Sequence, residues 1–223
     1  MKQHLRLATL VFGLLASASV RAGEFVLHPN GFGPESYAAW KAKQGIPDDP
    51  DEEGNADMAL YFQKQVPTST IAAGIAVITG FLKAQPPIPV ASLTGLSWEH
   101  RIDGHCGAGA PRWDIFVTGA SGAKYTLFLG CAAAVHSPGS EPTHWIRDSY
   151  PGPGAIVTAG AANAGITDSL AVADIAGGTI RALQIVFDEG NDTGTGFVFL
   201  DNITVTLEGM PHVWRSPADN GNN

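Results

Sequence analysis

Hydrophobic and polar residues alternate along much of the chain, and this alternation predicts short β-strands. In residues 96–102 every second side chain belongs to one face, as in a strand whose side chains point alternately to its two faces. That face consists of Leu96, Trp98, His100 and Ile102. Strands are predicted for residues 24–28, 58–65, 70–82, 93–102, 112–118, 124–129, 155–159, 169–173, 179–188 and 197–208. Because 27 Gly and 15 Pro residues divide the chain into such short segments, the pattern favours an all-β fold, an antiparallel β-sandwich.

One segment near the N-terminus departs from the alternation. Residues 34–45 begin with Pro34, end with Gly45 and hold helix-forming residues between them, which predicts one short N-terminal helix. Residues 70–82 suit a helix by their alanine content and a strand by their β-branched residues, and we favour the strand. The glycine- and proline-rich residues 137–154 are predicted to form a loop.

The first 22 residues have the pattern of a signal peptide. Lys2 and Arg6 precede an apolar run over residues 7–18, and small residues lead up to a cleavage point after Ala22. The run is shorter than the roughly 20 residues that a membrane-spanning helix needs. The sequence therefore predicts a secreted or periplasmic protein without membrane insertion. We expect one domain over residues 23–208, followed by a flexible polar tail over residues 209–223.

The charge of the chain bears on its partners. The formal net charge of −8 becomes −11 when the three cations of the signal peptide, Lys2, Arg6 and Arg21, are removed. A protein this acidic repels phosphate backbones and anionic lipid surfaces. Nucleic acid is therefore excluded as an expected partner, whereas neutral ligands and cations are favoured.

Cys106 and Cys131 are expected to form a disulfide, because exported chains fold under oxidising conditions. A turn signal at residues 119–122 lies between two strand-like segments, which predicts a β-hairpin. This hairpin brings Cys131 opposite Pro111, and the glycine-rich residues after Cys106 let the chain return to meet it. Closing the loop should stabilise the fold by roughly 3 kcal/mol.

Asp201 places a carboxylate in an otherwise apolar row. The other members of the row are Phe197, Phe199, Ile203, Val205 and Leu207. A buried carboxylate must be hydrogen-bonded, paired with a cation or bound to a metal. Hydrogen bonds to backbone amides or an ion pair with Arg101, Arg112 or Arg181 are one explanation, a structural Ca²⁺ is a second, and catalysis is a third.

Two segments resemble parts of a known fold family. Residues 188–205, which include Asp201-Asn202-Ile203, and the strand-like residues 54–62 are similar to the last and early strands of jelly-roll domains of the galactose-binding-like and carbohydrate-binding-module type. The resemblance implies a jelly-roll-like β-sandwich without an organic cofactor. It also implies a structural Ca²⁺ near Asp201, to which Asp188 and Asp192 offer further oxygen ligands.

A glycan-binding or extracellular interaction module is the function that the resemblance implies. Sugars bind exposed aromatic rings, while carboxylates and amides bind their hydroxyls. Trp145, Tyr150 and Asp148 lie in the predicted loop over residues 137–154, so they are the expected ligand-binding residues. No catalytic residue is assigned.

Histidines support a different function. Three converging imidazoles would hold zinc, and four histidines lie in the central third of the chain. These are His100, His105, His136 and His144. Their spacing matches no metalloenzyme signature, so a metal-dependent extracellular hydrolase is kept as an alternative. A structural surface or matrix component without a small ligand is a third hypothesis.

Overall fold

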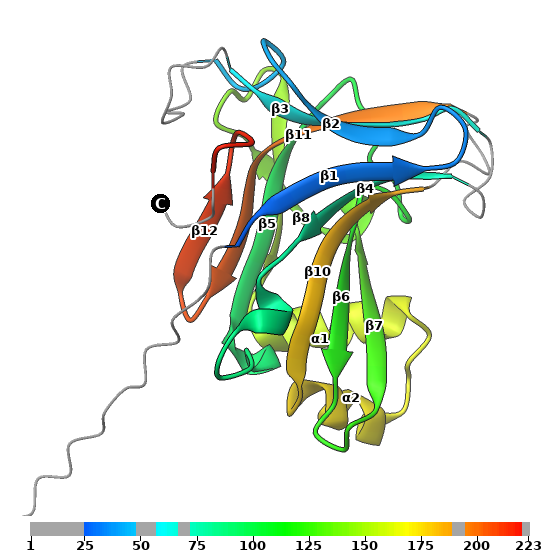
Figure 1. The fold of residues 1–223 in the computed structure, drawn as a ribbon, viewed down its shortest axis with the longest axis vertical. Coiled ribbons are helices and arrows are strands. Elements are labelled where there is room, and N and C mark those ends of the chain that lie inside the picture. Colours follow the sequence, from blue (N-terminus) through cyan, green and yellow to red (C-terminus); the bar gives the residue numbers. More distant parts are fainter. Residues whose placement is uncertain (1–24, 48–56, 67–71, 189–194, 220–223) are drawn as a thin grey trace, which may run out of the picture.

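The computed structural model describes residues 25–47, 57–66, 72–188 and 195–219. Two antiparallel sheets pack face to face in this part of the chain (Figure 1), so the predicted all-β sandwich is confirmed. The predicted signal peptide lies outside the described residues. The architecture follows from the strand pattern, because a sheet with one apolar face buries that face against a second sheet.

One sheet has five strands. Their spatial order is β1 (Leu27–Phe32), β4 (Ala73–Ile78), β10 (Thr179–Phe187), β6 (Arg112–Thr118) and β7 (Lys124–Gly130). The two last strands form the predicted hairpin, in which Arg112 pairs with Gly130 and Thr118 with Lys124. This hairpin can be predicted from local sequence alone, because a short turn joins two segments in which apolar and polar residues alternate.

The other sheet has seven strands. Its path runs through β2 (Tyr37–Lys41), β3 (Ala59–Lys64), β11 (Gly196–Leu207), β5 (Leu93–Arg101), β9 (Trp145–Pro151) and β8 (Val135–Pro138), and β12 (Met210–Trp214) pairs with β11 beside this path. β12 lies where the flexible tail was predicted. It is ordered there because Trp214 is buried and its indole N–H donates to the carbonyl of Phe25 over 3.1 Å.

The core lies between the two sheets. Trp98 of β5 stacks on Trp113 of β6 with ring centroids 5.0 Å apart, and both side chains are fully buried. Leu96 and His100 occupy the same inner face of β5 as Trp98 and are buried too. The alternation predicted for residues 96–102 is therefore confirmed at these three positions, whereas Ile102, the last member of the predicted row, is 52% exposed. Burial of each large apolar side chain contributes about 1.5–3 kcal/mol.

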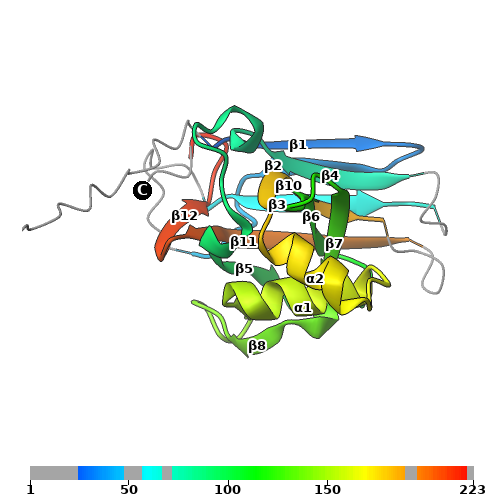
Figure 2. The same cartoon turned by 90° about the horizontal axis from the view of Figure 1, so that it is seen from below.

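Two α-helices replace two predicted strands. Helix α1 (Pro153–Asn163) and helix α2 (Ser169–Ala176) lie together at one end of the sandwich (Figure 2), where residues 155–159 and 169–173 were predicted as strands. Pro at the first helical position starts α1, and the carboxylate of Asp168 accepts from the Leu170 N–H over 3.0 Å to cap α2.

Three 3₁₀-helices complete the helical content of the described residues. They are η1 (Phe81–Lys83), η2 (Val90–Ser92) and η3 (Cys131–Ala133). None of the helices in the described residues has the length and apolar character that crossing a bilayer requires.

The helix predicted for residues 34–45 is wrong. Its centre forms β2, which pairs with β3 through Ala38 opposite Phe62 and Trp40 opposite Leu60. Ala38 is buried in the core, and helix propensity is a weak preference that such tertiary pairing overrides. The loop predicted for residues 137–154 is wrong for the same reason, because β9 pairs with β5 in the middle of the sheet.

Cys106 and Cys131 form the predicted disulfide, with their Cα atoms 5.2 Å apart. The N–H of Cys131 donates to the carbonyl of Pro111 over 2.8 Å, which confirms the predicted position of Cys131 opposite Pro111. The hairpin therefore brings the two cysteines together, and the disulfide fixes the end of β7 to the segment before β6.

A β-bulge in β11 moves its side chains from one face of the sheet to the other. Asp201 pairs with Glu99 and Thr204 with Ser97, so β11 has one more residue than β5 across this interval, and Asn202 has a positive φ of 45°. The predicted single row is therefore wrong. Ile203, Val205 and Leu207 enter the core, but Phe197 and Phe199 lie on the outer face of the sheet.

Candidate functional site

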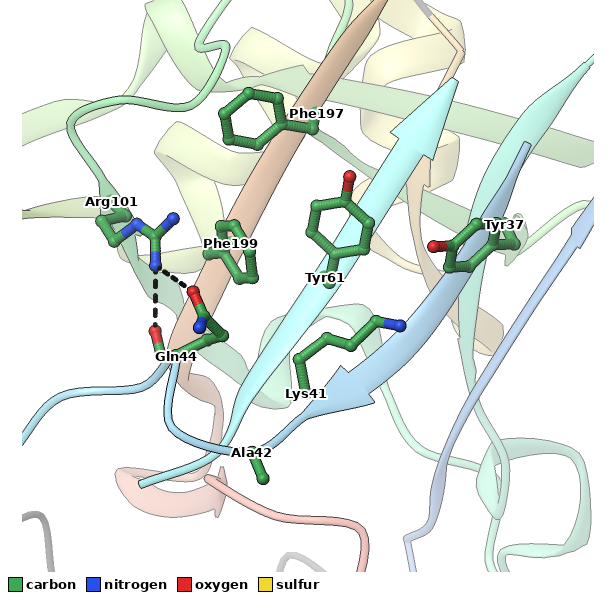
Figure 3. A pocket seen from close by; sticks show the side chains of 8 residues that line it. All are labelled: Tyr37, Lys41, Ala42, Gln44, Tyr61, Arg101, Phe197 and Phe199. Atoms are coloured by element: carbon green, nitrogen blue, oxygen red, sulfur yellow. Dashed lines mark hydrogen bonds between the residues drawn. The ribbon is translucent and has the colours of Figure 1, made fainter. Parts of the chain in front are cut away.

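The outer face of the seven-stranded sheet carries aromatic side chains from three adjacent strands. Phe199 of β11 pairs with Tyr61 of β3, while Tyr37 of β2 and Phe197 of β11 both pair with Gln63 of β3. Residues that are paired across antiparallel strands point to the same face. Figure 3 shows the four rings above these strands, and we call this site the aromatic groove.

The rings of the aromatic groove contact one another across the strands. Tyr61 lies at the centre, with its ring centroid 4.7 Å from that of Phe199, 6.1 Å from that of Phe197 and 5.9 Å from that of Tyr37. Tyr37, Tyr61 and Phe197 are half-buried, whereas Phe199 is only 8% exposed. Such tilted and edge-on arrangements are the favoured geometry of aromatic pairs, so the rings form one supported surface.

The groove has a volume of about 460 Å³. It is lined by Tyr37, Lys41, Ala42, Gln44, Tyr61, Arg101, Phe197 and Phe199. Apolar rings therefore form its floor, and two cations and an amide form its walls. This combination of an aromatic surface with a few polar groups is typical of small-molecule and sugar sites.

Arg101 forms one wall of the aromatic groove. Its guanidinium lies over the ring of Phe199, 3.8 Å from the centroid, and one of its N–H groups donates to the side-chain oxygen of Gln44 over 2.8 Å. The side chain also pairs with Asp103 over 2.7 Å. The hydrogen bond from Arg101 is the main reason that the pKa of Asp103 lies below its ordinary value. Arg101 is thus fixed in position by contacts on three sides.

Lys41 forms part of the opposite wall. Its ammonium nitrogen lies 5.4 Å from the ring centroid of Tyr37 and 5.8 Å from that of Tyr61. Within the part of the chain that the structure describes, no carboxylate forms an ion pair with Lys41. The ammonium group can therefore donate hydrogen bonds to a ligand that lies on the two rings.

The hydroxyl of Tyr61 is held by a neighbour in the same strand. It donates to the side-chain oxygen of Gln63 over 2.9 Å, and the amide nitrogen of Gln63 donates to the carbonyl of Glu35 over 3.1 Å. Burial raises the pKa of the Tyr61 phenol, and the nearby Tyr37 raises it further. The phenol is therefore neutral at physiological pH, and its oxygen can accept a hydrogen bond from a ligand.

Asp201 lies beneath the wall of the groove. Its carboxylate accepts hydrogen bonds from the backbone N–H of Ile46 over 2.9 Å and of Asn202 over 2.7 Å. The chain at Gly45 passes so close that a Cβ atom there would lie 2.8 Å from the carboxylate. Hydrogen bonding to amides, one of the explanations offered by the sequence, is what the structure contains. The consequence is that Asp201 fixes the segment that bears Gln44.

A second cavity of about 540 Å³ adjoins the aromatic groove and shares Gln44 and Arg101 with it. It is further lined by Lys43, Gly45, Pro47, Glu141, His144 and Trp145. His144 pairs with Glu141 over 2.6 Å. A hydrogen bond from Thr143 is the main cause that lowers the pKa of Glu141. The concave surface thus continues past Arg101, where Lys43, Glu141 and His144 take the place of most of the rings.

The three residues expected to bind a ligand do not form one exposed site. Trp145 is 2% exposed and packs with Ile46 and Phe199 on the outer face. Tyr150 is buried on the inner face, where its hydroxyl donates to the carbonyl of Gly130 over 2.5 Å. Asp148 is also fully buried. Trp145 lines the cavity next to the aromatic groove.

Two of the four candidate histidines come together. His100 and His136 each contact Asp148 through Nδ1, at 2.5 Å and 2.7 Å. His105 packs edge-on against Phe187, and His144 pairs with Glu141. Among the described residues, His100 is the only histidine in a group of three or more converging metal-ligand side chains. The described residues therefore do not contain the cluster of three imidazoles that the alternative hypothesis of a zinc hydrolase requires.

The candidate calcium ligands Asp201 and Asp188 have different partners. Asp201 binds the two amides described above, whereas Asp188 forms an ion pair with Arg112, with 2.9 Å between Oδ2 and Nη2. Asp192 lies outside the described residues. Within the described ranges, neither Asp201 nor Asp188 belongs to a group of three converging acidic, histidine or cysteine side chains.

No model of a protein family matches this chain, and no curated protein sequence matches it either.

Proposed function

We propose that the protein is a non-enzymatic glycan-binding module and that the aromatic groove is its binding site. The observation that carries the proposal is the continuous surface of Tyr37, Tyr61, Phe197 and Phe199 across three strands. The C–H faces of sugar rings pack on such aromatic faces. An antiparallel sheet holds the rings rigidly, so binding requires little ordering of the site.

Polar groups stand where the hydroxyls of a bound sugar would lie. Lys41 offers an ammonium group that forms no ion pair with a carboxylate of the described residues, and Gln44 offers an amide that Arg101 holds in place. The hydroxyl of Tyr61 is neutral and already donates to Gln63, which leaves its oxygen as an acceptor. These donors and acceptors would orient the ligand, while the rings would supply most of the buried area.

The size of the concave surface favours a short chain of sugars over a single sugar. The aromatic groove meets the second cavity at Gln44 and Arg101. Several sugar units laid along this surface would stack on the rings at one end and meet Glu141 and His144 at the other. Export, which the predicted signal peptide and the disulfide support, would bring the protein to extracellular polysaccharides.

The test is binding to a panel of neutral and acidic oligosaccharides and insoluble polysaccharides. Tyr61→Ala and Phe197→Ala should each weaken binding of the selected glycan by at least about tenfold, because each removes a stacking surface. Phe116→Ala is the matched control, since this half-buried ring lies on β6 of the other sheet. Equal binding by wild type and both groove variants, or no glycan bound by the wild type, would refute the proposal.

A further inference from the structure

A buried carboxylate stands at the centre of a second cluster, on the inner face of the seven-stranded sheet. Asp148 of β9 is fully buried and accepts a hydrogen bond from the indole N–H of Trp98 over 2.7 Å. Nδ1 of His100 lies 2.5 Å from the same oxygen, Oδ2, and Nδ1 of His136 lies 2.7 Å from Oδ1. The proposed glycan site makes no use of this cluster, because the aromatic groove lies on the opposite face of the sheet.

The disulfide lies directly beside this carboxylate. Sγ of Cys131 is 3.4 Å from Oδ2 of Asp148 and 4.0 Å from Nδ1 of His100. The ligand atoms of His100, Cys106, Cys131 and Asp148 all lie within 4.8 Å of one another. His100, Cys131 and Asp148 are buried, and Cys106 is partly buried.

We propose that reduction of the disulfide converts this cluster into a four-ligand zinc site. Two thiolates, one imidazole and one carboxylate are all ordinary zinc ligands, at bond lengths of about 2.0–2.3 Å. Tetrahedral bonds of that length separate the ligand atoms by about 3.3–3.8 Å. The distances from Cys131 to Asp148 and to His100 are already close to this. Cleavage of the S–S bond lets the two sulfurs separate, and Nδ1 of His100 and Oδ2 of Asp148, now 2.5 Å apart, must separate by about 1 Å to admit the metal.

The exposure of the two sulfurs determines which of them the reductant attacks. A thiolate of a dithiol reductant attacks Sγ of the partly exposed Cys106, and the buried Cys131 leaves as a thiolate that takes up a proton. The second thiol of the reductant closes its own disulfide and releases Cys106. The protein thus gains two electrons and two protons, and zinc binding then releases the two thiol protons.

Neighbouring groups already fix the ligands in place. Trp98 and His136 hold the two oxygens of Asp148, as outer contacts do around metal-bound carboxylates. The backbone N–H of Cys131 donates a hydrogen bond to the carbonyl of Pro111, so the backbone holds this cysteine independently of the S–S bond. The rearrangement after reduction would therefore be confined to separating the two sulfurs and separating His100 from Asp148, and the imidazole of His136 would remain an outer contact.

The experiment titrates the full chain with Co²⁺ and then with Zn²⁺, before and after reduction by a phosphine that is removed under anaerobic conditions. Reduced protein should bind one Co²⁺, with the near-ultraviolet absorption of thiolate-to-cobalt charge transfer, and Zn²⁺ should abolish this absorption by displacing it. Oxidised protein and the Cys106→Ser, Cys131→Ser double variant should give no such absorption. A reduced wild type without the absorption would overturn the proposal.

Two further variants distinguish the four-ligand site from binding by two thiolates alone. His100→Gln and Asp148→Asn should weaken Co²⁺ binding by at least about tenfold, whereas His144→Ala, which removes an exposed imidazole elsewhere, should leave it unchanged. Unchanged affinity in both cluster variants would overturn the proposal. If Zn²⁺ neither raises the melting temperature of reduced wild type nor slows the alkylation of both cysteines, the proposal is overturned whether or not these variants fold.

Discussion

Phe199 of β11 and Tyr61 of β3 face each other across the sheet with ring centroids 4.7 Å apart, on the side that faces away from the core. Phe199 in turn lies under the guanidinium of Arg101 at 3.8 Å. Its ring is therefore covered on one side by a cation and joined on another to the half-exposed Tyr61. The aromatic groove rests on this packing, and a ligand would contact Tyr61 and Phe197 more fully than Phe199.

Asp201 should stabilise both the fold and the groove. Asp201→Ala leaves the buried N–H groups of Ile46 and Asn202 without their acceptor, so it should lower the free energy of unfolding by about 1–3 kcal/mol. It should also weaken glycan binding, because the segment that bears Gln44 loses its anchor. Urea denaturation and the binding assay measure the two effects. Asp103→Ala, at an exposed position, is the control, and a change in stability as large as that of Asp201→Ala would contradict this role.

The disulfide should stabilise the oxidised protein. The Cys106→Ser, Cys131→Ser double variant should be less stable by roughly 3 kcal/mol, because the bond closes a loop between residues separated by 25 positions. Denaturation of oxidised wild type, reduced wild type and the double variant, all without metal, measures this. The last two should agree closely. A double variant as stable as oxidised wild type would show that the hairpin alone holds this region together.

Two glycines in α1 should respond in opposite ways to the same substitution. A Cβ at Gly160 would lie 2.8 Å from Cβ of the buried Leu127, so Gly160→Ala should destabilise the protein by about 1–3 kcal/mol. A Cβ at Gly154 would meet nothing within 4 Å, so Gly154→Ala should stabilise it by about 0.5–1 kcal/mol. Thermal denaturation compares the pair. Equal effects of the two substitutions would mean that Gly160 of α1 does not pack against Leu127 of β7.

Tyr150 should make the protein sensitive to alkaline pH. Burial raises the pKa of its phenol far above the ordinary value of about 10, with Asp148 as the second cause. A group whose folded pKa is raised contributes stability that is complete below the unfolded pKa and is lost as pH rises beyond it. The free energy of unfolding should therefore fall from about pH 10 upward.

Tyr150→Phe separates this effect from other alkaline effects. It should lose about 1 kcal/mol at pH 8, because the hydrogen bond to Gly130 is removed, and it should lose less stability than wild type between about pH 10 and 12. Urea denaturation at each pH measures both. A variant with the same alkaline slope as wild type would assign the loss to other tyrosines.

The parts of the fold that could be predicted are those with strong local signals. The hairpin of β6 and β7 follows from alternation and a glycine-rich turn, and Cys131 lies opposite Pro111 as a consequence. Helix α1 could not be distinguished from a strand, because its small and β-branched residues lack a clear amphipathic period. Its identity depends on close packing against Leu127, which no local pattern encodes.

Only part of the candidate site could be predicted from the sequence. Tyr37 was assigned to a helix, so its place beside Tyr61 could not be found until β2 was seen to pair with β3. Phe197 and Phe199 were assigned to the core, because nothing in the alternation marks the bulge that follows them. A carboxylate in an apolar row did indicate that Asp201 is structurally unusual, because the bulge at which the strand changes face begins directly after it.

That bulge makes the length of β11 as important as its composition. If Asn202 paired as an ordinary strand residue, regular alternation from Phe197 to Leu207 would direct Phe197 and Phe199 to the same side as Ile203, which already fills the space between the sheets. The rings and the buried residues therefore occupy opposite sides of the sheet only because the strand accommodates one extra residue at this point. A homologue that loses the extra residue together with the bulge should keep the rings on the outer face, whereas one that keeps the residue should keep the bulge as well.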